Sequence, residues 1–351
     1  MSEVDPRKGR SIVRGKMRPA DTAAQAPASV TYTISEAFSI FFSAKKAEGI
    51  RDRTVEDYET NWKYFTDWLE EDVPAIEITA ETIRDYINYM SNKTLFSGVP
   101  NRPQTDKKLK TQTVITRIRT LRTVFTFLAE EGYIQTSPLA KVKMPRKDRE
   151  DKPTFTDDDI RRLLDAPDTE TYAGLRDRCL MMTLADGGFR VNEALRLTTE
   201  HLDIKARCFN LPGWMNKNRK PRIVPLSPET VRELLRLVNE TRQYFDTDHI
   251  FVTNYGEPLK AAHFRKRLKA HAKAGGVDLS LAHPHQFRSY FITTYLLSGG
   301  DIFSCQRIVA HANIETTRGY AKLSEDNIRS QHAQYSPLAR LGLRRISKTK
   351  Q

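Results

Sequence analysis

A charged, proline-bounded segment divides the chain into two stretches with helical patterns. Residues 141–153 read Lys-Val-Lys-Met-Pro-Arg-Lys-Asp-Arg-Glu-Asp-Lys-Pro and offer almost nothing that a core could bury. Such a composition is typical of an exposed linker between domains. The 351 residues also suit two medium domains, at roughly 150 residues per domain. We therefore predict a flexible basic arm over 1–29, a helical domain over 30–146, a second domain over 147–336 and a basic tail over 337–351.

The first predicted domain contains four amphipathic helical runs. Between residues 31 and 128, apolar side chains recur at helical spacing. Thr54, with Asp57 three residues later, resembles a capping box and predicts the start of the second helix. Phe41 and Trp62 belong to a set of aromatic residues on the apolar faces. These aromatics indicate a helical core rather than a platform for stacking bases.

Lysine and arginine outnumber the acidic residues. The chain has 57 Lys and Arg against 44 Asp and Glu, a formal net charge of +13. Such an excess favours a polyanionic partner, either nucleic acid or an anionic membrane surface. We find no apolar run long enough to span a bilayer, and the N-terminal residues lack the apolar core of a signal peptide. We therefore expect a cytoplasmic nucleic-acid-binding protein with no membrane partner.

The cysteines and the distribution of basic residues narrow this class further. Cys179, Cys208 and Cys305 lie far apart and fit neither a disulfide framework nor a metal site, so we expect reduced cysteines and no metal. The arm over 1–29 suits either a solvated tail or a segment that follows phosphates. The fourth helical run has a basic face, which suits either solvent or DNA. Its DNA-binding candidates are Lys110, Arg117, Arg119 and Arg122.

The second predicted domain is mainly helical with a few short strands. Thr156, with Asp159 in the answering position, caps its first helix. Strand-like pieces at 208–211 and 222–226 flank a polar turn, and Ser227 followed by proline restarts a helix. The predicted fold class is therefore mainly α with a small antiparallel β-sheet.

Four separated pieces of the second domain carry residues that suit one site. Two pairs among these residues are three positions apart on predicted helices, so each pair projects from one helix face. A lysine lies in the polar turn, and a tyrosine follows a histidine by nine residues. Arginines, histidines, a lysine and a tyrosine together suit the binding and attack of a phosphodiester. The set comprises Arg190, Glu193, Lys217, His285, Arg288, His311 and Tyr320.

Each member of this set also has an ordinary explanation when it is taken alone. Arg190 could form a structural salt bridge with Glu193, and His285 could be a hydrogen-bonded interior histidine. Lys217 could be a solvated turn lysine, and Tyr320 could be a half-buried tyrosine. The complete set favours catalysis over these separate explanations.

The order and spacing of the set resemble the tyrosine recombinase (phage integrase) family. The resemblance lies mainly in segments 188–195 and 285–320, and Lys217 ahead of 220–226 matches the family's hairpin lysine. It extends weakly over the first domain. Ser289 departs from the family, which usually has a second histidine there. The turn before the first arginine also departs, because it reads Asp-Gly-Gly-Phe where Thr-Gly-Leu or Thr-Gly-Met is commoner.

The resemblance implies a role for each residue in cutting DNA. Tyr320 is the expected nucleophile and becomes a 3′-phosphotyrosine. Lys217 is the expected general acid for the leaving 5′ oxygen, and His285 is the expected base or proton relay. The remaining members are expected at the nonbridging oxygens: Arg190, Arg288 and His311, with Glu193 as the supporting residue.

The resemblance also implies an architecture, partners and cofactors. A helical, SAM-like core-binding domain and an α+β catalytic domain would form a clamp on double-stranded DNA with paired recombination sites. The expected assembly is a homotetramer, with accessory DNA-bending proteins as further candidate partners. No metal, ATP or other cofactor is implied. Basic residues near the hairpin are further DNA-binding candidates: Arg219, Lys220 and Arg222.

The implied function is site-specific recombination for a mobile element, by integration, excision or transposition. Two other classes stay open. A type IB topoisomerase would relax DNA with the same catalytic set, and a regulator would bind DNA without cutting it. The first domain and the order of the segments favour a recombinase over a topoisomerase. Tyr320 argues against a regulator, because pure binding requires no nucleophile.

Overall fold

The computed structural model describes residues 31–94, 106–146, 153–215, 220–320 and 325–340. Within these ranges the chain is mainly helical with one three-stranded antiparallel sheet, so the predicted fold class is confirmed. The chain divides after residue 150 into two compact units, here called the first unit and the second unit.

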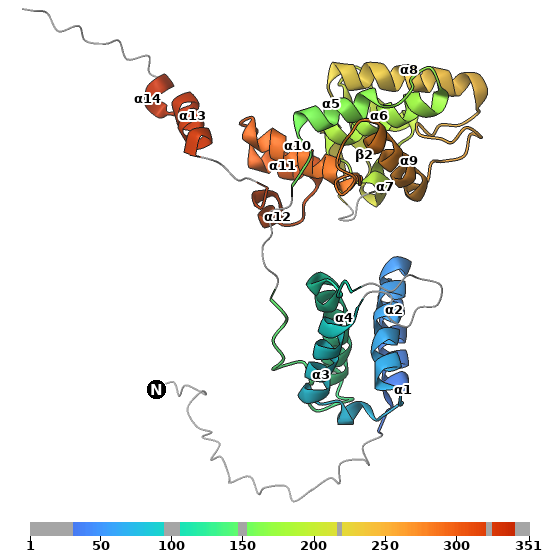
Figure 1. The fold of residues 1–351 in the computed structure, drawn as a ribbon, viewed down its shortest axis with the longest axis vertical. Helices are drawn as coiled ribbons and strands as arrows, with labels where there is room; N and C mark the ends of the chain where they lie inside the picture. Colours follow the sequence, from blue (N-terminus) through green and yellow to red (C-terminus); the bar gives the residue numbers. More distant parts are fainter. Residues whose placement is uncertain (1–30, 95–105, 147–152, 216–219, 321–324, 341–351) are drawn as a thin grey trace, which may run out of the picture. The chain divides into compact units, whose positions relative to one another are not determined.

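The described residues of the first unit form four α-helices, drawn in Figure 1, and one short 3₁₀-helix. Helix α4 packs against each of the other three helices. Capping boxes at Thr33 and Thr79 begin α1 and α3. The bounds are α1 Ile34–Ala47, α2 Asp52–Leu69, η1 Ala75–Glu77, α3 Ala80–Asn92 and α4 Thr111–Glu130.

The start of α2 differs from the prediction. Arg51, not Thr54, is the N-cap of this helix, and its carbonyl accepts hydrogen bonds from the backbone N–H groups of Thr54 and Val55. Thr54 therefore lies inside the helix. The exposed first turn can be solvated by water, so the helix begins without a side-chain cap.

Aromatic side chains form much of the core of the first unit, as predicted. Phe41, Phe65, Tyr86 and Phe125 are fully buried. The rings of Phe65 and Tyr86 meet edge to face with centroids 5.1 Å apart. These residues hold the helices together and present no exposed stacking platform.

The second unit contains the sheet and ten α-helices among the described residues. Its central helix is α6, which packs against α5, α8, α9 and α10. The bounds are α5 Asp157–Asp165, α6 Tyr172–Gly187, α7 Val191–Ala194, η2 Thr199–His201, β1 Leu202–Asp203, β2 Cys208–Leu211, η3 Gly213–Met215, β3 Arg222–Pro225, α8 Pro228–Tyr244, α9 Ala261–Ala274, α10 His285–Leu297, α11 Ile302–Val309, α12 Ile314–Arg318, α13 Glu325–Tyr335 and α14 Pro337–Arg340. Helix α14 lies in the segment for which the sequence predicts only a tail.

The strands pair in the order β1-β2-β3, all antiparallel. Strands β2 and β3 match the predicted strand-like pieces, and Leu211 pairs with Arg222 in their register. Strand β1 was not predicted, because two residues are too few to show an alternating pattern. Val224 of β3 is buried, whereas Ile223 is exposed, so alternate residues of β3 face the core.

Local capping residues begin two helices of the second unit as predicted. Thr156 and Asp159 form a capping box at α5. Ser227 caps α8 through the backbone N–H of Thr230, with Pro228 as the first helical residue. These caps depend only on neighbouring residues, which explains why the sequence reveals them.

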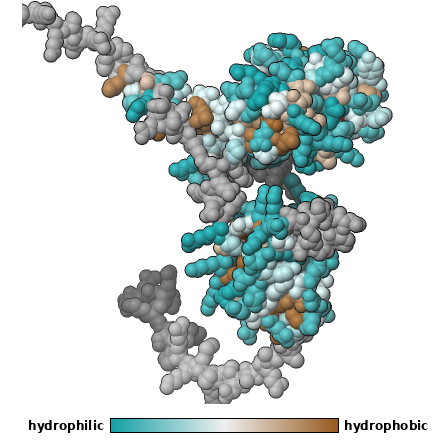
Figure 2. Space-filling view, viewed as in Figure 1, coloured by the Kyte–Doolittle hydropathy of each residue, from teal (hydrophilic) through white to brown (hydrophobic). Residues whose placement is uncertain are grey.

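The described part of the second unit carries a mostly hydrophilic surface on the face drawn in Figure 2. None of the helices in the described ranges combines the length and the apolar character needed to cross a membrane. The three cysteines are buried and form no disulfide.

Candidate active site

The turn after α6 delivers Arg190 to the site. Gly188 ends α6 in the left-handed conformation, with φ of 60°. A Cβ at this position would lie 2.5 Å from the ring of Phe291, so only glycine fits. Arg190, two residues later, is the N-cap of α7, and its side chain is one third exposed.

Glu193 holds Arg190 from the next turn. Its carboxylate accepts the backbone N–H of Arg190 at 3.1 Å and Nη1 of the Arg190 side chain at 2.9 Å. It also accepts Nη2 of Arg222 at 2.7 Å. Burial alone would raise the pKa of Glu193, but the hydrogen bonds and charges of Arg222 and Arg190 outweigh burial and lower it. Glu193 is therefore a buried anion between two cations.

Arg222 lies inside this cluster rather than on an open surface. Its side chain is only 6% exposed, although the sequence suggests it as a DNA-binding candidate. The buried Val224 lies two residues along β3, so strand alternation could have predicted an inward Arg222. The arrangement favours an ion pair with Glu193 over a direct contact with phosphate.

Arg288 projects from the first turn of α10 into the interior. Its side chain is almost fully buried, and it donates from Nη1 to the Gly188 carbonyl at 2.8 Å and from Nη2 to the Val309 carbonyl at 2.5 Å. Burial, with the neighbouring Arg190 cation, lowers the pKa of Arg288 to about 9. The guanidinium therefore stays charged at neutral pH and joins the two segments that precede Arg190 and His311.

His311 is fixed through its backbone and its ring. Gln306 accepts its N–H at 3.1 Å through the backbone carbonyl and donates to its carbonyl at 3.0 Å through the side-chain amide. The ring Nδ1 lies 2.9 Å from Oγ1 of Thr317. Burial, together with the positive charges of Arg288 and Arg190, lowers the pKa of His311 to about 4. His311 is therefore neutral at physiological pH.

Tyr320 lies beside His311. The two rings stack with centroids 6.5 Å apart and planes inclined by 22°. Tyr320 is half-buried against the small apolar cluster of α10 and α11, which includes Ile292 and Val309. Ionisation of the phenol would raise the pKa of Arg288, so Tyr320 lies within electrostatic reach of the buried guanidinium.

Of the remaining predicted site residues, the structure describes some and leaves others outside its described ranges. His285 is the exposed first residue of α10, and it contributes to the lowered pKa of His311, so the two rings share one region. Lys217 and Arg219 lie outside the described residues. Lys220, the first described residue after 215, is exposed. The structure thus brings together Arg190, Glu193, Arg288, His311 and Tyr320, with His285 nearby.

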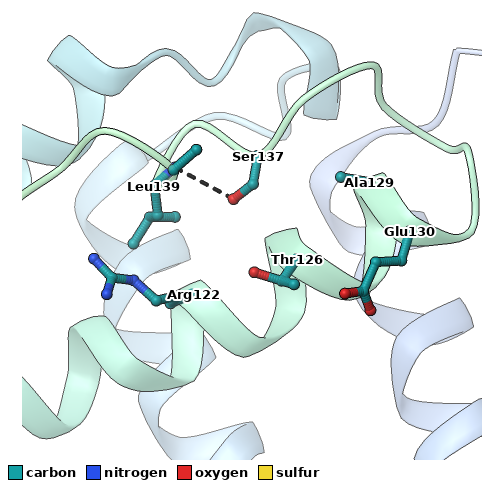
Figure 3. Close-up of a pocket in the computed structure, with 7 residues that line it drawn as sticks. Arg122, Thr126, Ala129, Glu130, Ser137 and Leu139 are labelled. Carbon is teal, nitrogen blue, oxygen red and sulfur yellow. Dashed lines mark hydrogen bonds between the residues drawn. The ribbon is translucent and has the colours of Figure 1, made fainter.

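The basic candidates of the first unit differ in their surroundings. Lys110 and Arg119 are exposed. The guanidinium of Arg117 lies 3.6 Å from the centre of the Tyr64 ring. Arg122 donates to the Val142 carbonyl at 2.7 Å and lines a pocket of about 380 Å³ (Figure 3). Arg117 and Arg122 thus have internal partners, whereas Lys110 and Arg119 face solvent.

Sequence reasoning missed a basic surface on α9. The inward residues Phe264 and Leu268 are fully buried, and the opposite face is exposed and carries no acid. The available signal was a 14-residue amphipathic segment whose polar residues are all basic. We call these exposed basic residues the α9 basic face: His263, Arg265, Lys266, Lys269 and Lys273.

Both units match models of known protein families. Residues 153–327 match the model of the phage integrase family, and residues 33–144 match that of the phage integrase SAM-like domain. The tyrosine recombinase XerD of Lacticaseibacillus casei is 30% identical over 215 residues, 60% of this chain and 72% of the relative. XerD of Listeria innocua is 26% identical over 297 residues, 83% of this chain and 95% of the relative.

Two groups of solved structures share the fold. The Tn1549 transposon integrase in complex with transposon right end DNA gives a TM-score of 0.68 at 17% identity, covering 87% of this chain and 99% of that chain. A lambda integrase tetramer bound to a Holliday junction gives a TM-score of 0.65 at 16% identity, covering 84% of this chain and 80% of that chain.

Proposed function

Because this chain belongs to the tyrosine recombinase (phage integrase) family and is a tyrosine-type site-specific recombinase, we propose that it cuts and rejoins DNA through Tyr320 for a mobile element. The observation that carries the assignment of the site is the gathering of Arg190, Arg288 and His311 around Tyr320. The proposed biological role is integration, excision or transposition. Proteins of the same fold include a transposon integrase and lambda integrase.

The cationic groups of the site neutralise the scissile phosphate. A phosphodiester is an anion, so attack by a phenolate requires compensation of its charge. Arg190, one third exposed, presents its guanidinium to the nonbridging oxygens. Arg288 adds positive charge from behind, because its side chain is almost fully buried and bound to two backbone carbonyls. These interactions strengthen as negative charge grows on the equatorial oxygens in the transition state.

The covalent step exchanges one phosphoester for another. The Tyr320 oxygen forms a bond to phosphorus while the bond from phosphorus to the 5′ oxygen breaks. An unperturbed tyrosine side chain has a pKa of about 10, so the nucleophile must lose its proton to a base, and His285 accepts it directly or through a relay. Lys217 donates a proton to the leaving 5′ oxygen. Attack by the 5′ hydroxyl of a partner strand reverses these steps and completes the exchange without ATP.

Each unit contacts the duplex, and basic surfaces supply most of the affinity. Lys110 and Arg119 on the first unit, and the α9 basic face on the second, suit contacts with phosphates. Exchange between two duplexes requires four active protomers, which supports a homotetramer on paired sites. Accessory bending proteins would assist where the sites are far apart along the DNA.

Capture of covalent intermediates tests this proposal. Purified protein is incubated with fragmented genomic DNA of its host, SDS is added, and DNA joined to protein is recovered and sequenced. We expect adducts at few sites, paired at the ends of a mobile element, and none with Tyr320→Phe. Adducts without site preference, together with relaxation of supercoiled plasmids, would indicate a topoisomerase instead. Specific binding with no adduct for the wild type would indicate a regulator.

A further inference from the structure

We propose that Thr317 is a positioning residue that fixes the tautomer of His311. By donating its hydroxyl hydrogen to Nδ1, Thr317 keeps the proton of the neutral ring on Nε2. His311 can then donate from Nε2 to a nonbridging phosphate oxygen. The inference rests on the proposed role of His311 at the scissile phosphate.

The geometry ties Thr317 to both His311 and Tyr320. Its Oγ1 lies 2.9 Å from Nδ1 of His311, and its backbone carbonyl accepts the N–H of Tyr320 at 3.0 Å. Thr317 is fully buried, so its hydroxyl is shielded from water. Thr316, the preceding residue of α12, is exposed. One buried threonine thus contacts the ring of the histidine and the backbone of the nucleophile.

The protonation state of His311 makes the tautomer decisive. A pKa of about 4 leaves the ring neutral at physiological pH, and a neutral imidazole has a single N–H. If Nδ1 carried that hydrogen, it would donate to Thr317, and Nε2 would present a lone pair. A lone pair repels a phosphate oxygen, whereas an Nε2–H group binds one. His311 can therefore donate a hydrogen bond to a phosphate oxygen when the Thr317 hydroxyl donates to its Nδ1.

The backbone contact gives Thr317 a second consequence. Tyr320 and His311 are both hydrogen-bonded to Thr317, so a shift of α12 moves the nucleophile and the phosphate-binding ring together. Gln306 holds the other side of His311 through two backbone-directed hydrogen bonds. Thr317 thus fixes which ring nitrogen of His311 carries the hydrogen, while Gln306 fixes the position of the His311 backbone.

Nitrogen NMR of the full chain labelled with [¹⁵N]histidine tests the tautomer directly. The His311 signals are identified by their loss in His311→Gln. We expect the Nε2–H form in the wild type and in Thr317→Ser, and a substantial Nδ1–H population in Thr317→Val. Thr316→Val, the same change on the exposed neighbour, should match the wild type. Wild-type protein in the Nδ1–H form, or Thr317→Val unchanged from the wild type, would overturn the proposal.

Cleavage kinetics test the consequence. On a nicked duplex carrying a site recovered by covalent capture, Thr317→Val should lose about 10–100-fold in adduct formation, by analogy with hydrogen bonds that orient metal-binding histidines. Thr317→Ser should restore the rate, and duplex affinity should not change. In a His311→Gln background Thr317→Val should cost nothing further, since Thr317 acts through His311. A full additional loss there would refute the proposal.

The two measurements separate the possible failures. A wild-type protein that forms no adduct would contradict the proposed function, whereas the tautomer measured in free protein would still report on Thr317. A wild type that cleaves at the same rate as Thr317→Val would contradict the role of Thr317 and leave the recombinase function intact.

Discussion

Replacement of Glu193 by glutamine should destabilise the second unit by about 3 kcal/mol. Breaking a buried ion pair by removing one partner costs about 3–5 kcal/mol. Glu193 is 4% exposed and accepts hydrogen bonds from both Arg190 and Arg222, so removal of its charge leaves two cations facing each other. Glutamine keeps one acceptor oxygen, which favours the lower end of that range. Its amide N–H₂, however, faces a guanidinium donor.

Thermal and urea unfolding of the full chain measure this effect. For a unit of this size, 3 kcal/mol corresponds to a fall of roughly 6–12 °C in Tm. Trp62 and Trp68 lie in the first unit and Trp214 lies in the second, so both proteins carry Trp214→Phe, and the remaining fluorescence serves as an internal reference that should not shift. Circular dichroism reports both units. Glu200→Gln is the matched control, because that side chain is 78% exposed and its replacement should change stability by less than about 0.5 kcal/mol.

The pH dependence gives an independent check on Glu193. Its pKa in the folded protein lies below the ordinary 4.5, so its stabilising contribution is complete above that value. The contribution is lost as pH falls through the folded pKa. The stability gap between wild type and Glu193→Gln should therefore be constant from neutral pH to about 5 and should narrow below 4.5. Equal unfolding midpoints at neutral pH would refute the ion-pair assignment.

Three further outcomes are expected. Tyr320→Phe should abolish covalent adducts while duplex affinity survives, because only the nucleophilic oxygen is lost; adduct from this variant would identify another nucleophile. Lys217→Ala should block cleavage of ordinary DNA but cleave a 5′-bridging phosphorothiolate, whose sulfur leaves without a general acid; a modified substrate that stays uncut would exclude Lys217 as the acid. Replacing Lys266 and Lys269 by glutamine should reduce the slope of log affinity against log salt by roughly 1–2; an unchanged slope would remove the α9 basic face from the DNA interface.

Features set by neighbouring residues were predictable from the sequence. Thr156 and Ser227 cap their helices through contacts within three residues. The aromatic residues of the first unit recur at helical spacing. Strands β2 and β3 were also found, because the polar turn between them separates two clear apolar pieces. The helix start at Arg51 was missed, since an exposed first turn needs no characteristic residue.

Features set by distant contacts could not be predicted as readily. The partner of Arg222 is Glu193, 29 residues earlier, and only the strand face shows that the arginine points inward. Residues 316 and 317 are both threonine, and only the burial of Thr317 in the folded chain distinguishes it from the exposed Thr316. The hold of Arg288 on the Gly188 and Val309 carbonyls likewise depends on how α10 packs.

Arg288 is in effect a noncovalent cross-link between two loops. Its two nitrogens bond carbonyls that lie 100 residues before it and 21 residues after it in the chain. One loop leads into Arg190, and the other leads into His311. Free guanidinium added to a truncated variant could restore the missing charge, but it could not restore the tether between the loops. Chemical rescue at this position should therefore remain incomplete, and the shortfall measures how much of the rate depends on loop order rather than on charge.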